Sequence, residues 1–222
     1  LLVGTTLLAV ILRTTVNLPL AVLATIAVGV FSALVMMTLG SHYLEQMVSV
    51  FGEFLANMEQ QLSQGGEPVQ LARPTAAQIA GMMGAGTGMT AVLCLMLGRY
   101  WQAALYNPGG FGTEFRALRY SPLVVTALAL VAVVLSSIGV EYRSWAMIVM
   151  LPLSFAGLAL VHARVHLKGQ GTGWLVAFYL AWLILDPVKL MVVFAAIADS
   201  WFDFRQRWSG SATRDISRRD DE

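Results

Sequence analysis

Five long apolar stretches dominate this sequence and restrict it to one class of fold. They cover residues 18–39, 75–98, 122–140, 145–161 and 174–197. A helix needs about 20 apolar residues, at roughly 1.5 Å each, to cross a hydrocarbon core of about 30 Å. Only 12% of the residues are charged, whereas a soluble domain carries about 25%. The sequence therefore predicts an all-α, polytopic transmembrane helical bundle with about five complete crossings.

The chain begins with a shorter apolar segment that reaches Arg13 after twelve residues. This is too short for a crossing, so we interpret it as the second half of an earlier helix, a partial N-terminal crossing. Residues 1–208 are then expected to form a single transmembrane domain. The tail 209–222 is polar and mixed in charge, and we expect it to be disordered.

The stretch 174–197 carries Asp186, Pro187 and Lys189 near its middle. An ionisable residue at the bilayer centre costs roughly 2.5–3.5 kcal/mol on insertion scales, so Asp186 must face something polar. In one interpretation, Asp186 and Lys189 neutralise each other and Pro187 merely kinks one continuous crossing. In the other, the two residues bind an ion, a proton or a polar solute at a broken helix, as in some transporters. A re-entrant hairpin is a further, less favoured variant, because only Pro187 interrupts the stretch.

Residues 41–63 form an amphipathic segment in which apolar side chains recur every three or four positions. Its glutamates make a crossing improbable, and membrane-surface helices usually carry Lys and Arg instead. We therefore predict an interfacial helix at one end of the bundle. It either covers the bundle's own end, the simpler interpretation, or docks a protein partner through Phe51, Phe54 and Met58.

The stretch 75–98 is rich in glycine and alanine at four-residue spacing, including Gly81, Gly84 and Gly88. Such rows let helix backbones approach closely in lipid, where packing rather than hydrophobicity drives association. The run from Gly84 to Gly88 is neither of the common nucleotide-binding glycine patterns and does not follow a strand. These glycines are predicted to pack helices together.

Residues 99–121 are predicted to be an interfacial connection, because aromatic side chains and an Asn-Pro-Gly-Gly turn signal gather there. Glu114 and Arg116, with Arg119 nearby, could form a gate or contact a ligand. The alternative is that they make a solvated or headgroup-facing edge.

The sequence offers little support for catalysis or for a metal. His162 and His166 share a helix face but lack a third ligand of the usual kind, so a basic helix end is the simpler interpretation. Cys94 is the only cysteine. No nucleophile or zinc-protease motif occurs. We expect no enzyme activity, no cofactor, no metal and no nucleic-acid partner.

The two sides of the membrane can be compared if every crossing reverses the chain. The tail 209–222 then shares a side with residues 41–74, and the connection 99–121 lies on the other side. Lys and Arg are almost equally divided between the two sides, so this count does not orient the chain. The arginines of the tail favour a cytoplasmic C-terminus.

The segment GGFGTEFRALRY at 109–120, the long amphipathic segment and a last helix leading into FDFR at 202–205 together resemble the YybS-like family. These are uncharacterised bacterial multi-spanning membrane proteins, similar in outline to the substrate-binding subunits of energy-coupling-factor transporters. The resemblance implies a bacterial inner-membrane location but no assigned chemistry, since a likeness in fold is weak support for function.

Two functions follow as expectations. The first is a transporter-type subunit that binds a small solute or an ion, with a polar site at Asp186 and Lys189 on the last helix. The second is a non-catalytic scaffold or accessory subunit of a larger membrane complex, docked through residues 41–63. In both, the partners are the lipid bilayer and either another protein or a second copy of the chain.

Overall fold

The computed structural model describes residues 1–63, 66 and 69–208, and in these ranges the chain is helical with no strand. The elements in chain order are α1 (Leu2–Thr15), α2 (Leu18–Leu23), α3 (Thr25–Thr38), α4 (Ser41–Ser63), α5 (Ala76–Tyr106), α6 (Gly110–Ala117), α7 (Pro122–Ile138), the short 3₁₀ helix η1 (Val140–Tyr142), α8 (Arg143–Leu167), α9 (Thr172–Ile184) and α10 (Asp186–Phe202). The prediction of an all-α chain is confirmed for the described ranges.

Several of these helices are long and apolar enough to cross a membrane. Among the described residues three qualify alone, namely Leu18–Thr38, Ala76–Tyr106 and Val140–Leu167. The number rises to five if each of two bent pairs, α6 with α7 and α9 with α10, is counted as one span. All five correspond in position to the predicted apolar stretches.

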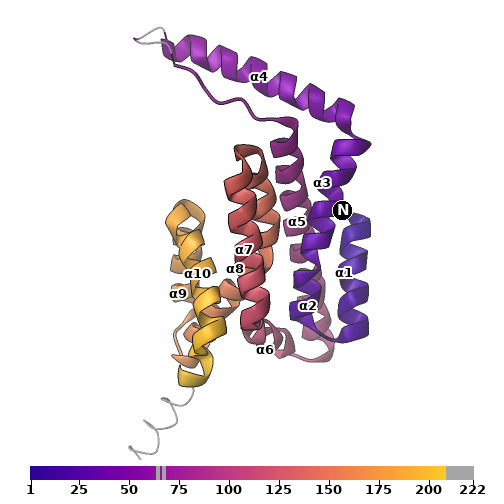
Figure 1. Ribbon diagram of the computed structural model, residues 1–222. Helices are drawn as coiled ribbons and strands as arrows, with labels where there is room; N and C mark the ends of the chain where they lie inside the picture. Colours follow the sequence, from indigo (N-terminus) through magenta and orange to yellow (C-terminus); the bar gives the residue numbers. More distant parts are fainter. Residues whose placement is uncertain (64–65, 67–68, 209–222) are drawn as a thin grey trace, which may run out of the picture.

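The long helices lie side by side, with α4 across one end of the bundle and α6 at the other (Figure 1). We call these the α4 end and the α6 end. The α4 end also holds η1 and residues 69–75, and Gln78 donates a hydrogen bond to the carbonyl of Val140 there. The α6 end also holds the turn between α1 and α2, residues 168–171 and residues 203–208.

Local sequence signals set where several helices begin. The Asn17 side chain accepts a hydrogen bond from the backbone N–H of Leu20 at 3.0 Å and so caps the start of α2, whose first turn contains Pro19. Thr75 and Gln78 form a reciprocal capping box at the start of α5. These caps satisfy backbone donors that would otherwise lack partners at a helix N-terminus.

Helix α5 lies at the centre of the bundle, packed against α3 and α8. A Cβ atom added to Gly84 would lie 2.5 Å from the backbone oxygen of Gly29 on α3. A Cβ on Gly81 would collide with Ser144 of α8, and one on Gly88 would lie 3.1 Å from a methyl group of Leu151. The three glycines therefore lie where neighbouring helices come closest to α5.

Helix α4 has the bounds predicted for the amphipathic segment, and it extends across the α4 end of the bundle (Figure 1). Leu44 is its only buried residue. It contacts α5 and α3 near its beginning. Further along, Glu59 accepts a hydrogen bond from the backbone of Leu71 and lies 3.7 Å from Arg73. The helix is thus attached to the bundle at its first turns and to the returning chain near its last.

Most of residues 99–121, which were predicted to be an interfacial connection, are helical. Helix α5 continues through Tyr106, and α6 follows after a turn in which Gly109 has a φ of 84°. That left-handed conformation is easily adopted by glycine alone, because it has no Cβ. The long α5 and the short α6 together bring Arg99 next to Glu114.

The single continuous crossing predicted for residues 174–197 is not present. Helices α9 and α10 are separated at Leu185, whose backbone is extended, and their axes are bent by 114°. Pro187 supplies the physical reason, since its ring would clash with the carbonyl of Leu183 in a continuous helix and it cannot donate a backbone hydrogen bond. The observed form is the less favoured variant, a hairpin of two shorter helices.

This hairpin also corrects the predicted grouping of the chain's two sides. Residues 203–208 lie at the α6 end, where Arg205 donates hydrogen bonds to the carbonyl oxygens of Arg116 and Leu118. The end of the described chain therefore shares a side with residues 99–121 and not with residues 41–74. The tail 209–222 itself lies outside the described residues.

Candidate functional site

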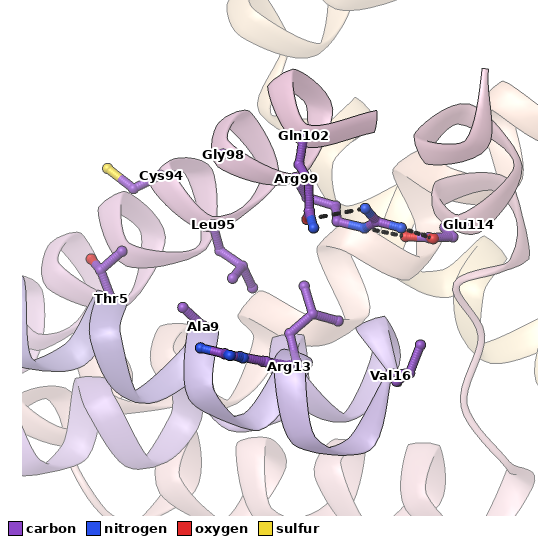
Figure 2. A pocket seen from close by; sticks show the side chains of 11 residues that line it. Thr5, Ala9, Arg13, Val16, Cys94, Leu95, Gly98, Arg99, Gln102 and Glu114 are labelled. Atoms are coloured by element: carbon purple, nitrogen blue, oxygen red, sulfur yellow. Dashed lines mark hydrogen bonds and ion pairs between the residues drawn. The ribbon is translucent and has the colours of Figure 1, made fainter. Parts of the chain in front are cut away.

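A cavity of about 790 Å³ lies between α1 and α5 and reaches α6. Figure 2 shows its two long walls, with residues of α1 facing residues of α5 across the space. The lining residues are Thr5, Ala9, Leu12, Arg13, Val16, Cys94, Leu95, Gly98, Arg99, Gln102 and Glu114. Its size and its mixture of apolar walls with a few polar groups are typical of small-molecule sites.

An ion pair closes the α6 side of this cavity. The Arg99 guanidinium donates from Nε to Glu114 Oε2 at 2.8 Å and from Nη2 to the other carboxylate oxygen. Its third nitrogen, Nη1, donates to the Gln102 side chain at 3.1 Å. The Arg99 side chain is only 18% exposed. Both charges are therefore held by each other, and the paired geometry fixes the position of the Glu114 carboxylate.

Arg13 is the other charged residue of the cavity, and it lies in the last turn of α1. In the described part of the chain its guanidinium has no hydrogen-bond or ion-pair partner. The wall beside it is apolar, formed by Ala9, Leu12 and Leu95. A free guanidinium next to an apolar wall suits a small molecule with an anionic group, because Arg donates two parallel hydrogen bonds to a carboxylate or phosphate.

The structure distributes the predicted ligand-binding residues over separate places. Glu114 lines the cavity, whereas Arg116 does not. The side chain of Arg116 instead donates a hydrogen bond to the Thr113 hydroxyl of its own helix, at 3.4 Å. Asp186 and Lys189 lie at the start of α10, distant in the fold from the cavity, and the Lys189 Nζ donates to Asp186 Oδ1 at 2.7 Å. Lys189 thus reaches Asp186, as the first interpretation of this pair expected.

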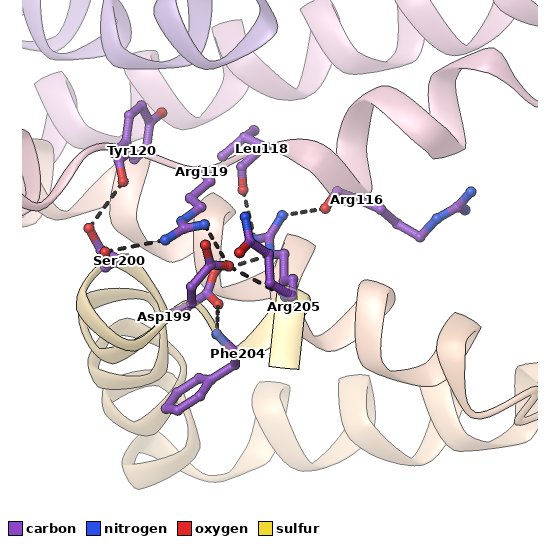
Figure 3. A network of polar contacts seen from close by, with 10 residues as sticks. Arg116, Leu118, Arg119, Tyr120, Asp199, Ser200, Phe204 and Arg205 are labelled. Carbon is purple, nitrogen blue, oxygen red and sulfur yellow. Dashed lines mark hydrogen bonds and ion pairs between the residues drawn. The ribbon is translucent and has the colours of Figure 1, made fainter. Parts of the chain in front are cut away.

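A buried ion pair that the sequence analysis did not single out lies at the α6 end (Figure 3). Asp199, in the last turn of α10, is 1% exposed, and its carboxylate lies 3.1 Å from Nε of Arg205. The other carboxylate oxygen accepts a hydrogen bond from the backbone N–H of Phe204. Burial lowers the pKa of Arg205 from its ordinary value, and the charge of Asp199 opposes that effect.

Further polar contacts surround this pair and join α10 to the segment before α7. Arg119 lies 2.8 Å from the Asp203 carboxylate and holds the pKa of that group below its ordinary value. The Ser200 hydroxyl donates to the carbonyl of Tyr120, and the Tyr120 hydroxyl donates to the carbonyl of Pro19. This network attaches the second half of the hairpin to the bundle. Its signal in the sequence is an aspartate in the last turn of an apolar helix, followed six residues later by an arginine.

The candidate partner-binding residues on α4 are largely uncovered. Phe51 is 41% exposed and Phe54 58% exposed, while Met58 is half-buried. His162, considered above as a metal ligand, contacts the carbonyl of Leu158 and the rings of Phe115 and Tyr179. Within the described ranges no group of three or more histidine, cysteine or acidic residues is arranged to hold a metal ion.

We compared the chain with protein-family models, curated proteins and solved structures. No family model, no curated protein and no solved structure matches this chain. The resemblance to the YybS-like family therefore stays a prediction, and functional argument depends on the geometry of the chain alone.

Proposed function

We propose that the protein is a multi-spanning membrane protein of transporter type that binds a small anionic solute in the cavity between α1, α5 and α6. The observation that carries the proposal is the cavity itself, about 790 Å³ in volume, with the free Arg13 guanidinium beside an apolar wall. The paired Arg99 and Glu114 supply a fixed, polar closure at its α6 side. The expected solute carries a carboxylate or phosphate and an apolar body.

This proposal moves the solute site from the last helix, where the sequence analysis expected it, to α1 and α5. The reason is that Asp186 and Lys189 already pair with each other and neither residue lines the cavity. A charged group that already has an ion-pair partner binds an anionic solute less readily than an unpaired guanidinium does.

The charge distribution favours one orientation in the membrane. Among the described residues, eight Lys and Arg lie at the α6 end, whereas Arg73 and Arg143 alone lie at the α4 end. The eight are Arg13, Arg99, Arg116, Arg119, Arg164, Lys168, Arg205 and Arg207. Cytoplasmic loops carry the excess of basic residues in membrane proteins, so the proposed orientation has the α6 end in the cytoplasm. The proposed location is a bacterial inner membrane.

The solute proposal can be tested by extracting small molecules from gently purified protein and identifying them by mass spectrometry. Arg13→Gln is the test variant, and Arg116→Gln is the matched control, because it removes the same charge at the same end but outside the cavity. We expect an anionic species that accompanies the wild type and Arg116→Gln and is absent from Arg13→Gln. Equal content in all three, or no bound species in any, would overturn the proposal.

A second candidate function is the docking of another protein by α4. The specific observation is that α4 buries only Leu44 and exposes Phe51 and Phe54 across the α4 end. Phe54→Glu should then release a protein that co-purifies with the wild type, whereas Glu53→Gln on the same helix should retain it. If the same proteins co-purify with both variants, α4 only covers the bundle.

A further inference from the structure

The hairpin of α9 and α10 presents an outer surface that nothing in the described chain covers. Helix α9 has no buried residue. On α10, Val192 and Ala196 face inward and are buried, whereas Asp186 and Phe194 face outward. The large apolar side chains that the hairpin exposes include Leu183, Ile184, Leu190, Met191 and Phe194.

The charged residues of this surface, Asp186 and Lys189, lie far from the α6 end along the axis of the bundle. Gly157 of α8 is in close contact with Val192 of α10, and it lies ten residues, roughly 15 Å, from the end of α8 at Leu167. Asp186 precedes Val192 by six residues, about 9 Å further from the α6 end. With the bundle in a membrane, the pair of Asp186 and Lys189 therefore lies inside the hydrocarbon core.

A single ion pair does not satisfy these two groups in lipid. The Lys189 ammonium has three donors and the Asp186 carboxylate about four acceptor sites, and one contact at 2.7 Å uses one of each. The Asp186 side chain is 89% exposed and that of Lys189 is 44% exposed. Unsatisfied polar groups are costly in hydrocarbon, so a further polar group must meet the pair there.

We propose that a second copy of this chain packs against the hairpin, so that Lys189 of each copy meets Asp186 of the other. The surface carries one acid and one base, and a two-fold axis brings such a surface onto itself with unlike charges opposed. The resulting ring of four charges gives each group a second partner. A different protein would have to bring its own acid and base to the same depth, which is why a second copy is the better occupant.

The first experiment leaves the native charges in place and measures cross-linking between copies in native membranes. In a Cys94→Ala background, Leu183→Cys probes the hairpin, and Leu130→Cys on α7 is the matched control, since their side chains are 68% and 61% exposed. We expect oxidation to give a covalent dimer with Leu183→Cys and little with Leu130→Cys. Equal dimer at both positions, or none at Leu183→Cys, would overturn the proposal.

The second experiment tests the charges with two differently tagged chains expressed together. Asp186→Lys in both chains, or Lys189→Asp in both, opposes like charges and should weaken co-purification about tenfold, near the largest effects seen for single polar contacts between membrane helices. Asp186→Lys in one chain with Lys189→Asp in the other restores unlike pairs and should restore co-purification. Failure of the mixture to recover, while each chain remains folded, contradicts the proposed contact. Apart from Cys94→Ala, which the test variant and its control share, neither experiment changes a residue that lines the cavity, so the outcome is independent of the solute proposal.

Discussion

Helices α8 and α9 are neighbours in the chain and both are strongly apolar, yet they are buried to opposite degrees. Fifteen of the 25 residues of α8 are buried, and none of the 13 residues of α9 is. The buried helix contains serine and histidine and a glycine at a close helix contact, whereas the exposed one is almost wholly apolar. In lipid the exterior is as apolar as any core, so helices pack through small residues and polar contacts instead. Apolar content alone therefore marks the surface of this bundle better than its interior.

Helices α8 and α9 also differ in how they are attached to the rest of the bundle. Helix α8 contacts α3, α5, α7 and α10, whereas α9 has few contacts beyond α10 and α8. The hairpin is held mainly at its second half, by the close approach of Gly157 to Val192 and by the ion pair of Asp199 and Arg205. Variants that change these contacts should therefore affect the stability of the hairpin and that of the packed bundle to different degrees.

The largest expected effect is the loss of the buried ion pair. Asp199→Ala leaves the Arg205 charge without its buried partner, and breaking a buried pair costs about 3–5 kcal/mol. Stability in detergent should fall accordingly, and the hairpin should become susceptible to protease before the rest of the bundle. Asp203→Ala is the control, because that carboxylate is more exposed, and its effect should be much smaller. Equal stability of the two variants would show that the buried pair does not anchor the hairpin.

The next effect concerns the packed centre. Gly84→Ala forces a methyl group against the Gly29 backbone and should destabilise the fold by about 1–3 kcal/mol, as overpacking does. Gly86→Ala adds the same atom two residues away, where nothing lies within 4 Å. Thermal unfolding in detergent measures both, and Gly86→Ala should be unchanged or slightly more stable because alanine favours helix. Similar losses in both would mean that α3 and α5 are not in close contact.

A direct comparison of the two regions uses one substitution in each. Val149→Ala on α8 removes methyl groups from a site that is 5% exposed, and we expect a loss of about 1–2 kcal/mol from the cavity it leaves. Val176→Ala on α9 removes the same atoms from a side chain that is 55% exposed, and stability should change by less than about 0.5 kcal/mol. The reverse order would place α9, not α8, in the packed core.

The smallest expected effect is on the stability of the protein at low pH. Arg119 holds the pKa of Asp203 below its ordinary value of 3.8, so this contact stabilises the folded state above that value. The stabilisation is lost as the pH falls through the lowered pKa. Between pH 7 and pH 3 the wild-type Tm should therefore fall further than the Tm of Asp203→Asn. Parallel curves for the two proteins would show that the contact with Arg119 contributes nothing.

The sequence predicted the helices well and their arrangement only in part. The periodicity of residues 41–63 located α4, because periodicity is a local property of the sequence. The consequence of Pro187 was not predictable, since a proline can kink a helix or divide it. In this protein the chain divides into two helices, and the second is held by contacts of α10 with α8 and with Tyr120, and by contacts of Arg205 with Arg116.

The candidate site was missed for a related reason. Its walls come from α1 and α5, which are separated by sixty residues in the chain, and Arg13 looked like an ordinary basic residue at a turn. Only Glu114 was identified beforehand, from its place among charged residues before α7. Its pairing with Arg99 depends on the length of α5 and on the turn at Gly109, neither of which the composition reveals.

The central claim is that α9 and α10 return the chain to the α6 end. Labelling of single cysteines with a membrane-impermeant maleimide in sealed vesicles of known orientation tests it most directly. In a Cys94→Ala background the probes are Gln170→Cys before α9, Gln206→Cys after α10 and Asn57→Cys on α4. The hairpin predicts that positions 170 and 206 are labelled from the same side and position 57 from the opposite side. Labelling of position 206 from the same side as position 57 would show a complete crossing and contradict the hairpin.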